Sequence, residues 1–473
     1  QGLFQASDPE VNQGNIPSTR DMLDQGAEQI RSSVPDEETR LALMETMAGA
    51  YTGLGLYEKA NGLYTDLVKQ FEVMDGGGSA RLAAAYGGLS YGMAHLGKHD
   101  QAGEWGAKAV ATARRLRPTD AGVEAVALER HCLAYHQAAK FGDAVGLCKE
   151  AAEKARGSGL SRLEQARILR NYGRALKDTS EFAAAEKNYR EALELARAGG
   201  GQRSPTVAVT LDEMGGLYFR QGRFELATES FQKAIELQKI LYPDGHLSTA
   251  RTLNNLANTR ATMRRYEEAE GIYKQAHVLY RTFLGEESGE LATSLSNMAV
   301  TQQESGRLEE AAGTLRRVME MHARTTGREK RPYLNSALKY ANLRTEQGEA
   351  REAVRVAREV VAGMDGLKPV PKLESGFARV VLAASLIESG RAAEALEPAR
   401  AGHEILSGVL QPTHWMRHYA DIALGASLAA SGRREEGRAL LRPVMELHSK
   451  NKGPRGWRAG WVKKLWNRYV GRG

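Results

Sequence analysis

A turn that recurs at a fixed spacing along nearly the whole chain is the feature that most constrains its fold. Successive turns lie 42 residues apart, with a single interval of 41 residues. The turn positions are Gly55, Gly97, Ala139, Ser180, Gly222, Arg264, Gly306, Gly348, Gly390 and Gly432. Self-similarity at a fixed period of roughly 20 to 50 residues is typical of repeat architectures. The spacing therefore predicts ten copies of one structural unit across residues 37–449.

Small residues flank the turns at constant offsets. Five residues after the turns lie Ala60, Ala102, Ala144, Ala185, Ala227, Ala269, Ala311, Ala353, Ala395 and Gly437. Seven residues before the turns lie Ala48, Ser90, Cys132, Gly173, Gly215, Ala257, Ala299, Ala341, Ala383 and Gly425. Because small side chains let two helices approach closely, this pattern predicts an antiparallel helical hairpin at every turn. A single hairpin cannot bury both of its faces, so we expect the hairpins to stack.

The combination of small residue, tight turn, aromatic residue and alanine resembles the tetratricopeptide repeat. The segments LNNLA at 253–257 and YEEAE at 266–270 resemble repeats of the kinesin-light-chain type. This resemblance implies an all-α fold, a right-handed superhelical solenoid of about ten antiparallel helix hairpins. The helices should be longer than usual, since the common period is about 34 residues. The pattern departs at Ala139 and Arg264, which replace the turn glycine, and at Arg379 and Asp421, which replace large apolar residues.

The composition is that of a folded protein and divides the chain into three parts. Hydrophobic residues make up 42% and charged residues 26%, which disfavours both disorder and a membrane-spanning protein. We expect an N-terminal leader and capping helix at 1–36, ten repeats forming one solenoid at 37–449, and a basic Trp-rich capping helix or tail at 450–473. Because the chain begins at Gln1 without Met, we also expect it to be a fragment or a processed product.

The leader carries a second resemblance. The segment LFQASDP at 3–9, followed by Asn15 and a helix through 19–24, is similar to the junction after a membrane-anchored bacterial serine/threonine kinase module. The resemblance implies that the repeats form the docking or sensory region of a bacterial signalling protein. The chain contains no glycine-rich loop with its lysine, no His-Arg-Asp and no Asp-Phe-Gly motif. Any kinase activity would therefore reside in an upstream domain.

The resemblance implies that binding residues lie on the inner helix of each hairpin, facing a concave groove. Positions thirteen, ten, nine and six residues before a turn identify that groove. The predicted binding residues are Arg167, Arg170, Asn171, Arg174, Arg251, Asn254, Asn255, Asn258, Asn297, Asn335, Lys339 and Asn342. Asn can donate and accept hydrogen bonds and Arg presents a planar fork to carboxylates, so an extended, acidic or C-terminal peptide is the expected ligand. The alternative is that the Asn residues bind neighbouring repeats and the Arg residues form a solvated helix face.

The C-terminal tail is the basic part of the chain. Residues 448–473 contain eight Lys or Arg and no acidic residue, against a formal net charge of +7 for the whole chain. Trp457, Trp461, Trp466 and Tyr469 are interleaved with these charges, and Leu465 shares a helix face with two of them. We interpret the tail as a capping helix. Binding of an anionic membrane surface or of nucleic acid is the alternative.

Few other residues suggest chemistry. Cys132 and Cys148 are predicted to lie on the two helices of one hairpin. We interpret them as small buried thiols, or as a disulfide if the chain lies outside the cytoplasm. His414, His418 and Asp421 share a helix face, but without a His-Glu-x-x-His motif we expect no metal there.

These observations predict a scaffold without catalytic activity or cofactor, whose partner is a protein or peptide. The alternative is a repeat protein that binds nucleic acid or a membrane surface through its basic tail. Nucleic acid is disfavoured because the groove positions of repeats one, two, nine and ten are mostly Ala, Gly and apolar residues. Membrane contact would come only from the tail or from an upstream anchor, on either side of the membrane.

Overall fold

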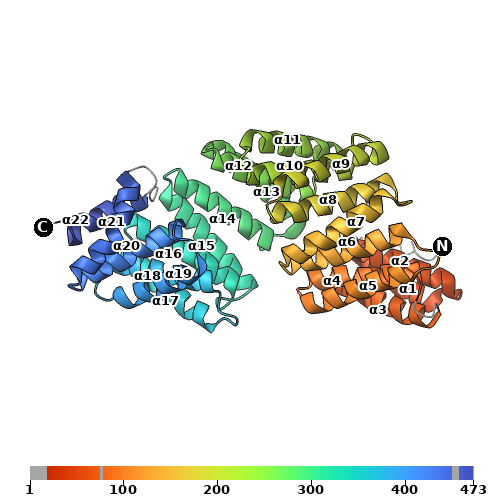
Figure 1. Cartoon of the computed structure of the whole chain (residues 1–473), viewed down its shortest axis with the longest axis horizontal. Helices are drawn as coiled ribbons and strands as arrows, with labels where there is room; N and C mark the ends of the chain where they lie inside the picture. Colours follow the sequence, from red (N-terminus) through yellow and green to blue (C-terminus); the bar gives the residue numbers. More distant parts are fainter. Residues whose placement is uncertain (1–18, 75–77, 450–456, 472–473) are drawn as a thin grey trace, which may run out of the picture. The chain divides into compact units, whose positions relative to one another are not determined.

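The computed structural model describes residues 19–74, 78–449 and 457–471, and every regular element in these ranges is an α-helix (Figure 1). The chain separates into two compact units, residues 1–243 and 244–473. Within each unit the helices pack chiefly against their neighbours along the chain, as antiparallel pairs. The predicted all-α class and the hairpin repeat are therefore confirmed.

The first unit holds helices α1 to α11. Their bounds are α1 Thr19–Ser33, α2 Glu37–Gly53, α3 Tyr57–Met74, α4 Ala80–His95, α5 His99–Arg115, α6 Ala121–Gln137, α7 Phe141–Arg156, α8 Arg162–Asp178, α9 Phe182–Gly200, α10 Pro205–Arg220 and α11 Phe224–Leu241.

The second unit holds helices α12 to α22. Their bounds are α12 Leu247–Thr262, α13 Tyr266–Leu284, α14 Gly289–Glu304, α15 Leu308–Thr325, α16 Arg331–Gln347, α17 Ala350–Gly366, α18 Lys372–Glu388, α19 Leu396–Val409, α20 Trp415–Ala430, α21 Arg434–Ser449 and α22 Trp457–Tyr469. The even-numbered helices from α2 to α20 are the first helices of the ten hairpins, and they are called inner helices below.

All ten predicted turns are present. The backbone at each turn position is left-handed, with φ between 57° and 87°. Glycine adopts this conformation without a steric penalty, whereas Ala139, Ser180 and Arg264 adopt it at a cost of roughly 1 to 2 kcal/mol each. At the turn of Arg264 the N–H of Arg265 donates to the carbonyl oxygen of Arg260 at 2.9 Å, which closes α12. The period of the sequence therefore marks the helix ends correctly even where glycine is absent.

The small residues are the points of closest helix contact. The alanines five residues after the turn are 0% exposed in repeats one to nine. A Cβ added at Gly173 would lie 2.9 Å from the ring of Tyr189, and one added at Gly215 would lie 2.6 Å from the ring of Phe231. Larger side chains at these positions would push the two helices of a hairpin apart, as the sequence pattern predicts.

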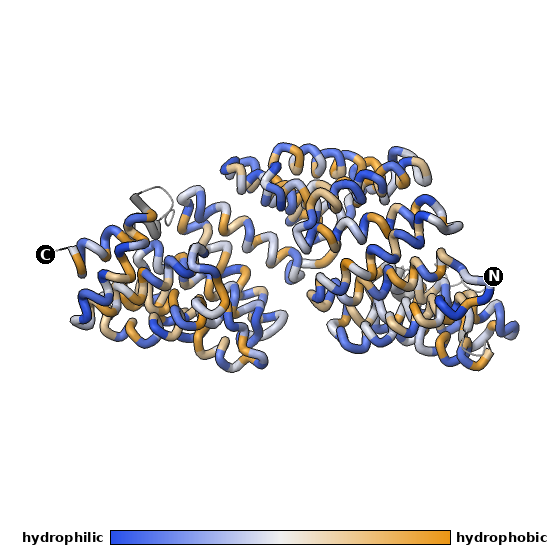
Figure 2. Tube along the Cα trace, in the orientation of Figure 1, coloured by the Kyte–Doolittle hydropathy of each residue, from blue (hydrophilic) through white to orange (hydrophobic). Residues whose placement is uncertain are grey.

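Side-chain caps fix where most inner helices begin. The side chains of Asp36, Ser79, Asp120, Ser161, Ser204 and Ser288 each accept a hydrogen bond from a backbone N–H of the first turn. Such caps typically stabilise a helix by about 1 kcal/mol. Hydrophobic and hydrophilic residues are mixed along the helices of both units (Figure 2), as expected when each helix buries one side only.

Additional helices lie at the two ends of the repeat series. In α1, Asp24 accepts a hydrogen bond from the hydroxyl of Tyr51 at 2.8 Å and pairs with Lys59.

The leader segment 3–9 and Asn15, on which the kinase resemblance rests, lie outside the described residues. None of the described helices combines the length and the apolar character needed to cross a bilayer.

Candidate functional site

The predicted binding residues lie on inner helices of both units. Four are on α8 of the first unit, and the others are on α12, α14 and α16 of the second. Within α8 the residues 167, 170, 171 and 174 follow helical spacing and share one side of the helix. The residues 251, 254, 255 and 258 do the same on α12, and 335, 339 and 342 on α16. The structure thus places them as two separate groups, one per unit.

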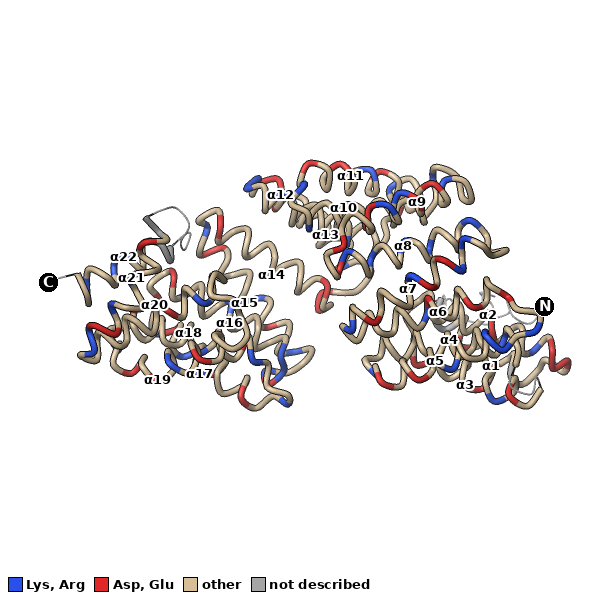
Figure 3. Tube along the Cα trace, viewed as in Figure 1, with Lys and Arg blue, Asp and Glu red and all other residues tan. Residues whose placement is uncertain are grey.

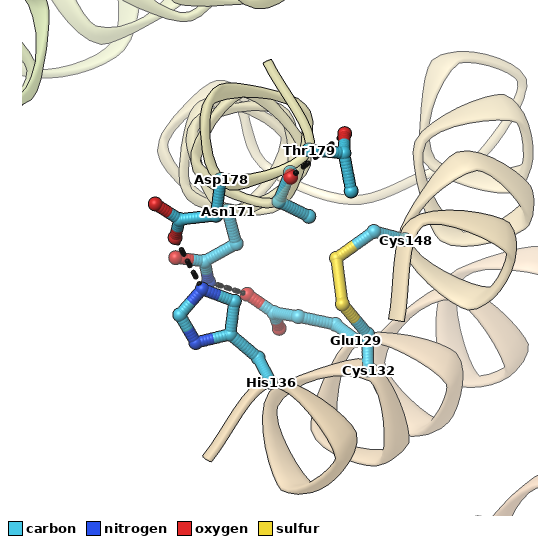
Figure 4. The surroundings of a disulfide bond; sticks show 8 residues. Glu129, Cys132, His136, Cys148, Asn171, Asp178 and Thr179 are labelled. Carbon is cyan, nitrogen blue, oxygen red and sulfur yellow. Dashed lines mark hydrogen bonds and ion pairs between the residues drawn. A yellow bond between two sulfur atoms is a disulfide. The ribbon is translucent and has the colours of Figure 1, made fainter. Parts of the chain in front are cut away.

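In the first unit, the α8 group is tied to a buried carboxylate on α6. Glu129 is 0% exposed. One of its oxygens binds the guanidinium of Arg167. The other accepts a hydrogen bond from the amide Nδ2 of Asn171 at 2.7 Å (Figure 4). Asn171 therefore binds a neighbouring repeat, as in the alternative interpretation, whereas Arg167 pairs with a buried carboxylate and does not form a purely solvated helix face. A buried carboxylate is tolerated because two donors satisfy it.

A disulfide lies beside this carboxylate. Cys132 of α6 and Cys148 of α7 are bonded, with their Cα atoms 5.4 Å apart and both side chains 1% exposed. One turn further along α6, His136 contacts Asp178 of α8 at 2.7 Å (Figure 4). The same side of α6 is therefore joined to α7 covalently and to α8 by polar contacts. The sequence left open whether these cysteines pair, and the structure pairs them.

The two other predicted arginines of α8, Arg170 and Arg174, interact electrostatically with a carboxylate from the next repeat. Glu213 of α10 accepts a hydrogen bond from Lys177 at 2.7 Å and from Tyr189 at 3.3 Å. Burial alone would raise the pKa of Glu213, but Lys177, Arg174 and Arg170 hold it below its ordinary value. Burial also lowers the pKa of the Arg170 guanidinium, partly offset by Glu213. This part of the groove is consequently a mixed ionic network rather than a purely basic strip.

Glu129, Glu213 and Lys177 are site residues that the prediction missed. The signal was available, because Glu129 lies ten residues before the turn at 139 and Glu213 nine residues before the turn at 222. The prediction emphasised the basic and amide residues of repeat four and did not apply the same offsets to its neighbours. Figure 3 shows acidic and basic residues interspersed along the helices of both units. A nucleic-acid-binding face would instead require basic residues that dominate one side.

In the second unit, the amide oxygens of several predicted asparagines lack hydrogen-bond partners among the described residues. The Oδ1 atoms of Asn254, Asn335 and Asn342 are buried and accept no hydrogen bond from any described residue. Lys339 lies on the same side of α16, one turn from each of its two asparagines. Lys339 is an exposed residue and forms no ion pair with a carboxylate among the described residues. Desolvation by the surrounding protein lowers the pKa of its ammonium. This group presents three acceptors and one cation.

The other predicted residues of the second unit are partly engaged. Asn258 accepts a hydrogen bond from the hydroxyl of Tyr273 at 2.5 Å, and exposed Arg251 lies 3.7 Å from Glu290. Asn255 and Asn297 are half-buried on α12 and α14. Within the predicted groove, the most unused hydrogen-bonding capacity therefore belongs to the Oδ1 atoms of Asn254, Asn335 and Asn342 and to Lys339. These four residues are called the α12/α16 amide group below.

The remaining candidate chemistry has structural partners. Asp421 contacts His403 at 2.9 Å, while His414 caps the start of α20 through its Nδ1 atom. In the tail, Trp461, Val462 and Leu465 of α22 are buried against the second unit. The indole N–H of Trp461 and the ammonium of Lys464 both donate to Glu388 at 2.7 Å. The apolar side of α22 is thus used for packing within its own unit.

Comparison with known proteins agrees with this architecture. Models of the tetratricopeptide repeat match residues 166–198, 206–282 and 291–330. The solved structure of the apo form of RapI matches with a TM-score of 0.54 at 12% identity, covering 78% of this chain and 98% of that one. Residues 166–198, 206–282 and 291–330 thus match tetratricopeptide repeats, and the helical hairpins before and after them have the same fold.

Two further structures match less closely. A Rap protein complexed with competence and sporulation factor gives a TM-score of 0.45 at 12% identity, covering 77% of this chain and 99% of that one. A kinesin-light-chain-like repeat protein from Podosopora anserina gives 0.37 at 24% identity, covering 44% of this chain and 98% of that one. No curated protein matches the sequence.

Proposed function

We propose that this chain is a scaffold that binds an extended peptide segment of a partner protein along its inner helices. The observation that carries the proposal is the α12/α16 amide group. A buried amide oxygen without a hydrogen bond costs roughly 1 to 3 kcal/mol. An extended peptide presents backbone N–H groups at regular intervals, which are the donors that Asn254, Asn335 and Asn342 lack. Lys339 adds a preference for an acidic side chain or a terminal carboxylate on the same peptide.

The groove of the first unit is expected to contribute differently. There Arg167 and Asn171 already have a partner in Glu129, so their replacement would act first on stability and only indirectly on binding. Arg170 and Arg174 keep their charge beside Glu213 and would attract acidic groups mainly through the local field. We therefore assign direct peptide contact in the predicted set to α12 and α16 before α8.

A finer hypothesis is that the partner belongs to bacterial signalling and that the scaffold is coupled to a serine/threonine kinase. It rests on the resemblance of residues 3–24 alone. Reading the coding sequence upstream of Gln1 tests it directly. A kinase catalytic motif set followed by a membrane anchor would support the hypothesis, and an unrelated upstream sequence would contradict it.

Peptide selection on the purified chain tests the proposed function. A random peptide library displayed on phage is panned against wild type and against the double variant Asn335→Ala, Asn342→Ala. We expect peptides that bind wild type and lose most of their affinity for the variant. The variant's melting temperature should fall little, because the two lost Oδ1 atoms have no hydrogen-bond partner among the described residues. The matched control Asn258→Ala should instead lower stability, since it breaks the hydrogen bond from Tyr273.

The outcomes separate cleanly. Peptides that bind both proteins equally would show that the α12/α16 amide group is not the contact site. A failure to enrich any peptide on wild type would count against peptide binding itself.

A further inference from the structure

An apolar pocket of about 390 Å³ lies in the first unit. Its walls include Tyr64 of α3, Ala84 and Gly88 of α4, and Val126 of α6, with Leu160 closing one side. Ala84 and Val126 lie thirteen residues before their turns, the same offset that identifies groove positions elsewhere. The pocket therefore lies on the inner helices and falls in the size range of ligand pockets, roughly 300 to 1,000 Å³.

Missing side-chain volume creates the pocket. A Cβ added at Gly88 would lie 2.5 Å from the ring of Tyr64, so the tyrosine packs directly on the backbone of α4. Ala84 is exposed on the same helix. The equivalent position of repeat four, also thirteen residues before the turn, is Arg167 on α8. Where repeat four fills its groove with charged side chains, repeat two leaves it open and apolar.

The charge beside this pocket is positive and available. Arg130 lines the wall, stacks over the ring of Tyr91 at 4.6 Å and has no carboxylate partner among the described residues.

The acidic residues of the same pocket are already occupied. Glu45 pairs with Arg81 at 3.0 Å, and Glu164 accepts from the backbone N–H of Ser161 at 2.9 Å in a capping box. An apolar cavity whose wall includes Arg130, a guanidinium without a carboxylate partner among the described residues, is complementary to an apolar side chain followed by a carboxylate.

We propose that this pocket holds an apolar side chain of the bound peptide, and that an adjacent Asp or Glu of that peptide pairs with Arg130. The inference rests on the proposed peptide-binding function and adds its sequence preference. Arg130 lies in the wall of the pocket itself, so the carboxylate is expected on a residue next to the apolar one within an extended chain.

The test uses a library whose peptides are fused to the phage at their C-termini, so that only internal carboxylates are offered. We expect enriched peptides to contain a large apolar residue next to Asp or Glu. In fluorescence polarisation with one enriched peptide, Ala84→Leu, which fills the pocket, should weaken binding by about tenfold or more. Arg130→Gln should weaken it similarly and reduce its dependence on salt.

Matched controls are available in the same unit. Ala183→Leu adds the same side chain at an exposed alanine of α9, and Lys149→Gln removes one exposed charge from α7. Both should leave the affinity unchanged. Circular dichroism melting of every variant checks that it folds. If Ala84→Leu is destabilised, Arg130→Gln still tests the proposal, because Arg130 is half-buried and has no ion pair among the described residues.

Enriched peptides that lack the apolar-acidic pair, or full affinity in both Ala84→Leu and Arg130→Gln, would overturn this inference. If such peptides still lost affinity for the Asn335→Ala, Asn342→Ala variant, the proposed function would stand while the pocket assignment failed. If no peptide bound wild type, both would fail.

Discussion

Replacing Cys132 and Cys148 with alanine removes the covalent link between α6 and α7 while changing little buried volume. The bond joins residues separated by 16 positions in the sequence. The chain-entropy model gives about 3 kcal/mol for a loop of this length. For a unit of the size of residues 1–243, that corresponds to a fall in melting temperature of roughly 6 to 12 °C.

The loss should be concentrated near the bond. Glu129 and His136 lie one turn to either side of Cys132 on α6, and both bind α8. Hydrogen exchange should therefore speed up in α6, α7 and α8 more than in α2 and α3. Calorimetry of wild type and the double-alanine variant, with thiol titration of the unfolded wild type before and after reduction, gives the comparison.

Two results would refute this reasoning. Free thiols in the unreduced, unfolded wild type would show that the cysteines are not paired. An unchanged melting temperature in the double-alanine variant would show that the bond does not restrain the unfolded chain as the loop length requires.

Three further predictions concern single residues. Glu129→Ala should lower the free energy of unfolding by about 2 to 3 kcal/mol in urea titrations, because Asn171 and partly exposed Arg167 lose their shared buried partner; a change below 0.5 kcal/mol would contradict the pairing. Arg264→Gly should raise stability by about 1 kcal/mol, since glycine removes the cost of a left-handed arginine, and a destabilised variant would argue against that turn. Burial, with smaller effects from Arg281 and Arg317, lowers the pKa of His277 to about 4 in the folded state. As the pH falls, this histidine therefore takes up its proton in the unfolded state before it does so in the folded state. The second unit should then lose about 1.4 kcal/mol per pH unit between the ordinary histidine value of 6.5 and about 4, and His277→Gln should flatten that slope in pH-dependent urea titrations.

The sequence predicts the repeat geometry well because the responsible interactions are local. A left-handed turn followed five residues later by a small residue specifies one hairpin, and Arg264 shows that the period holds even when the turn glycine is lost. The same offsets locate Asn254, Asn335 and Asn342 on inner helices. Their lack of partners depends on the side chains of adjacent helices and could not be read from the period.

Contacts between repeats are the part that the sequence did not predict. Glu129 binds residues 38 and 42 positions away, and nothing in a single repeat indicates which residue of the next repeat will reach it. The apolar pocket was similarly invisible, because Gly88 and Ala84 are simply two of the small residues at the groove positions of repeat two. Their importance lies in the volume left between Tyr64 and α6, which requires three helices to be placed together.

The most direct test of the central claim maps where a selected peptide lies on the chain. Hydrogen exchange is measured on the purified protein with and without a saturating concentration of an enriched peptide. The account predicts slowed exchange in the inner helices α12 and α16, with α4 and α6 added if the apolar pocket is occupied. Protection confined to the outer helices α13, α15 and α17, with α12 and α16 unchanged, would contradict it.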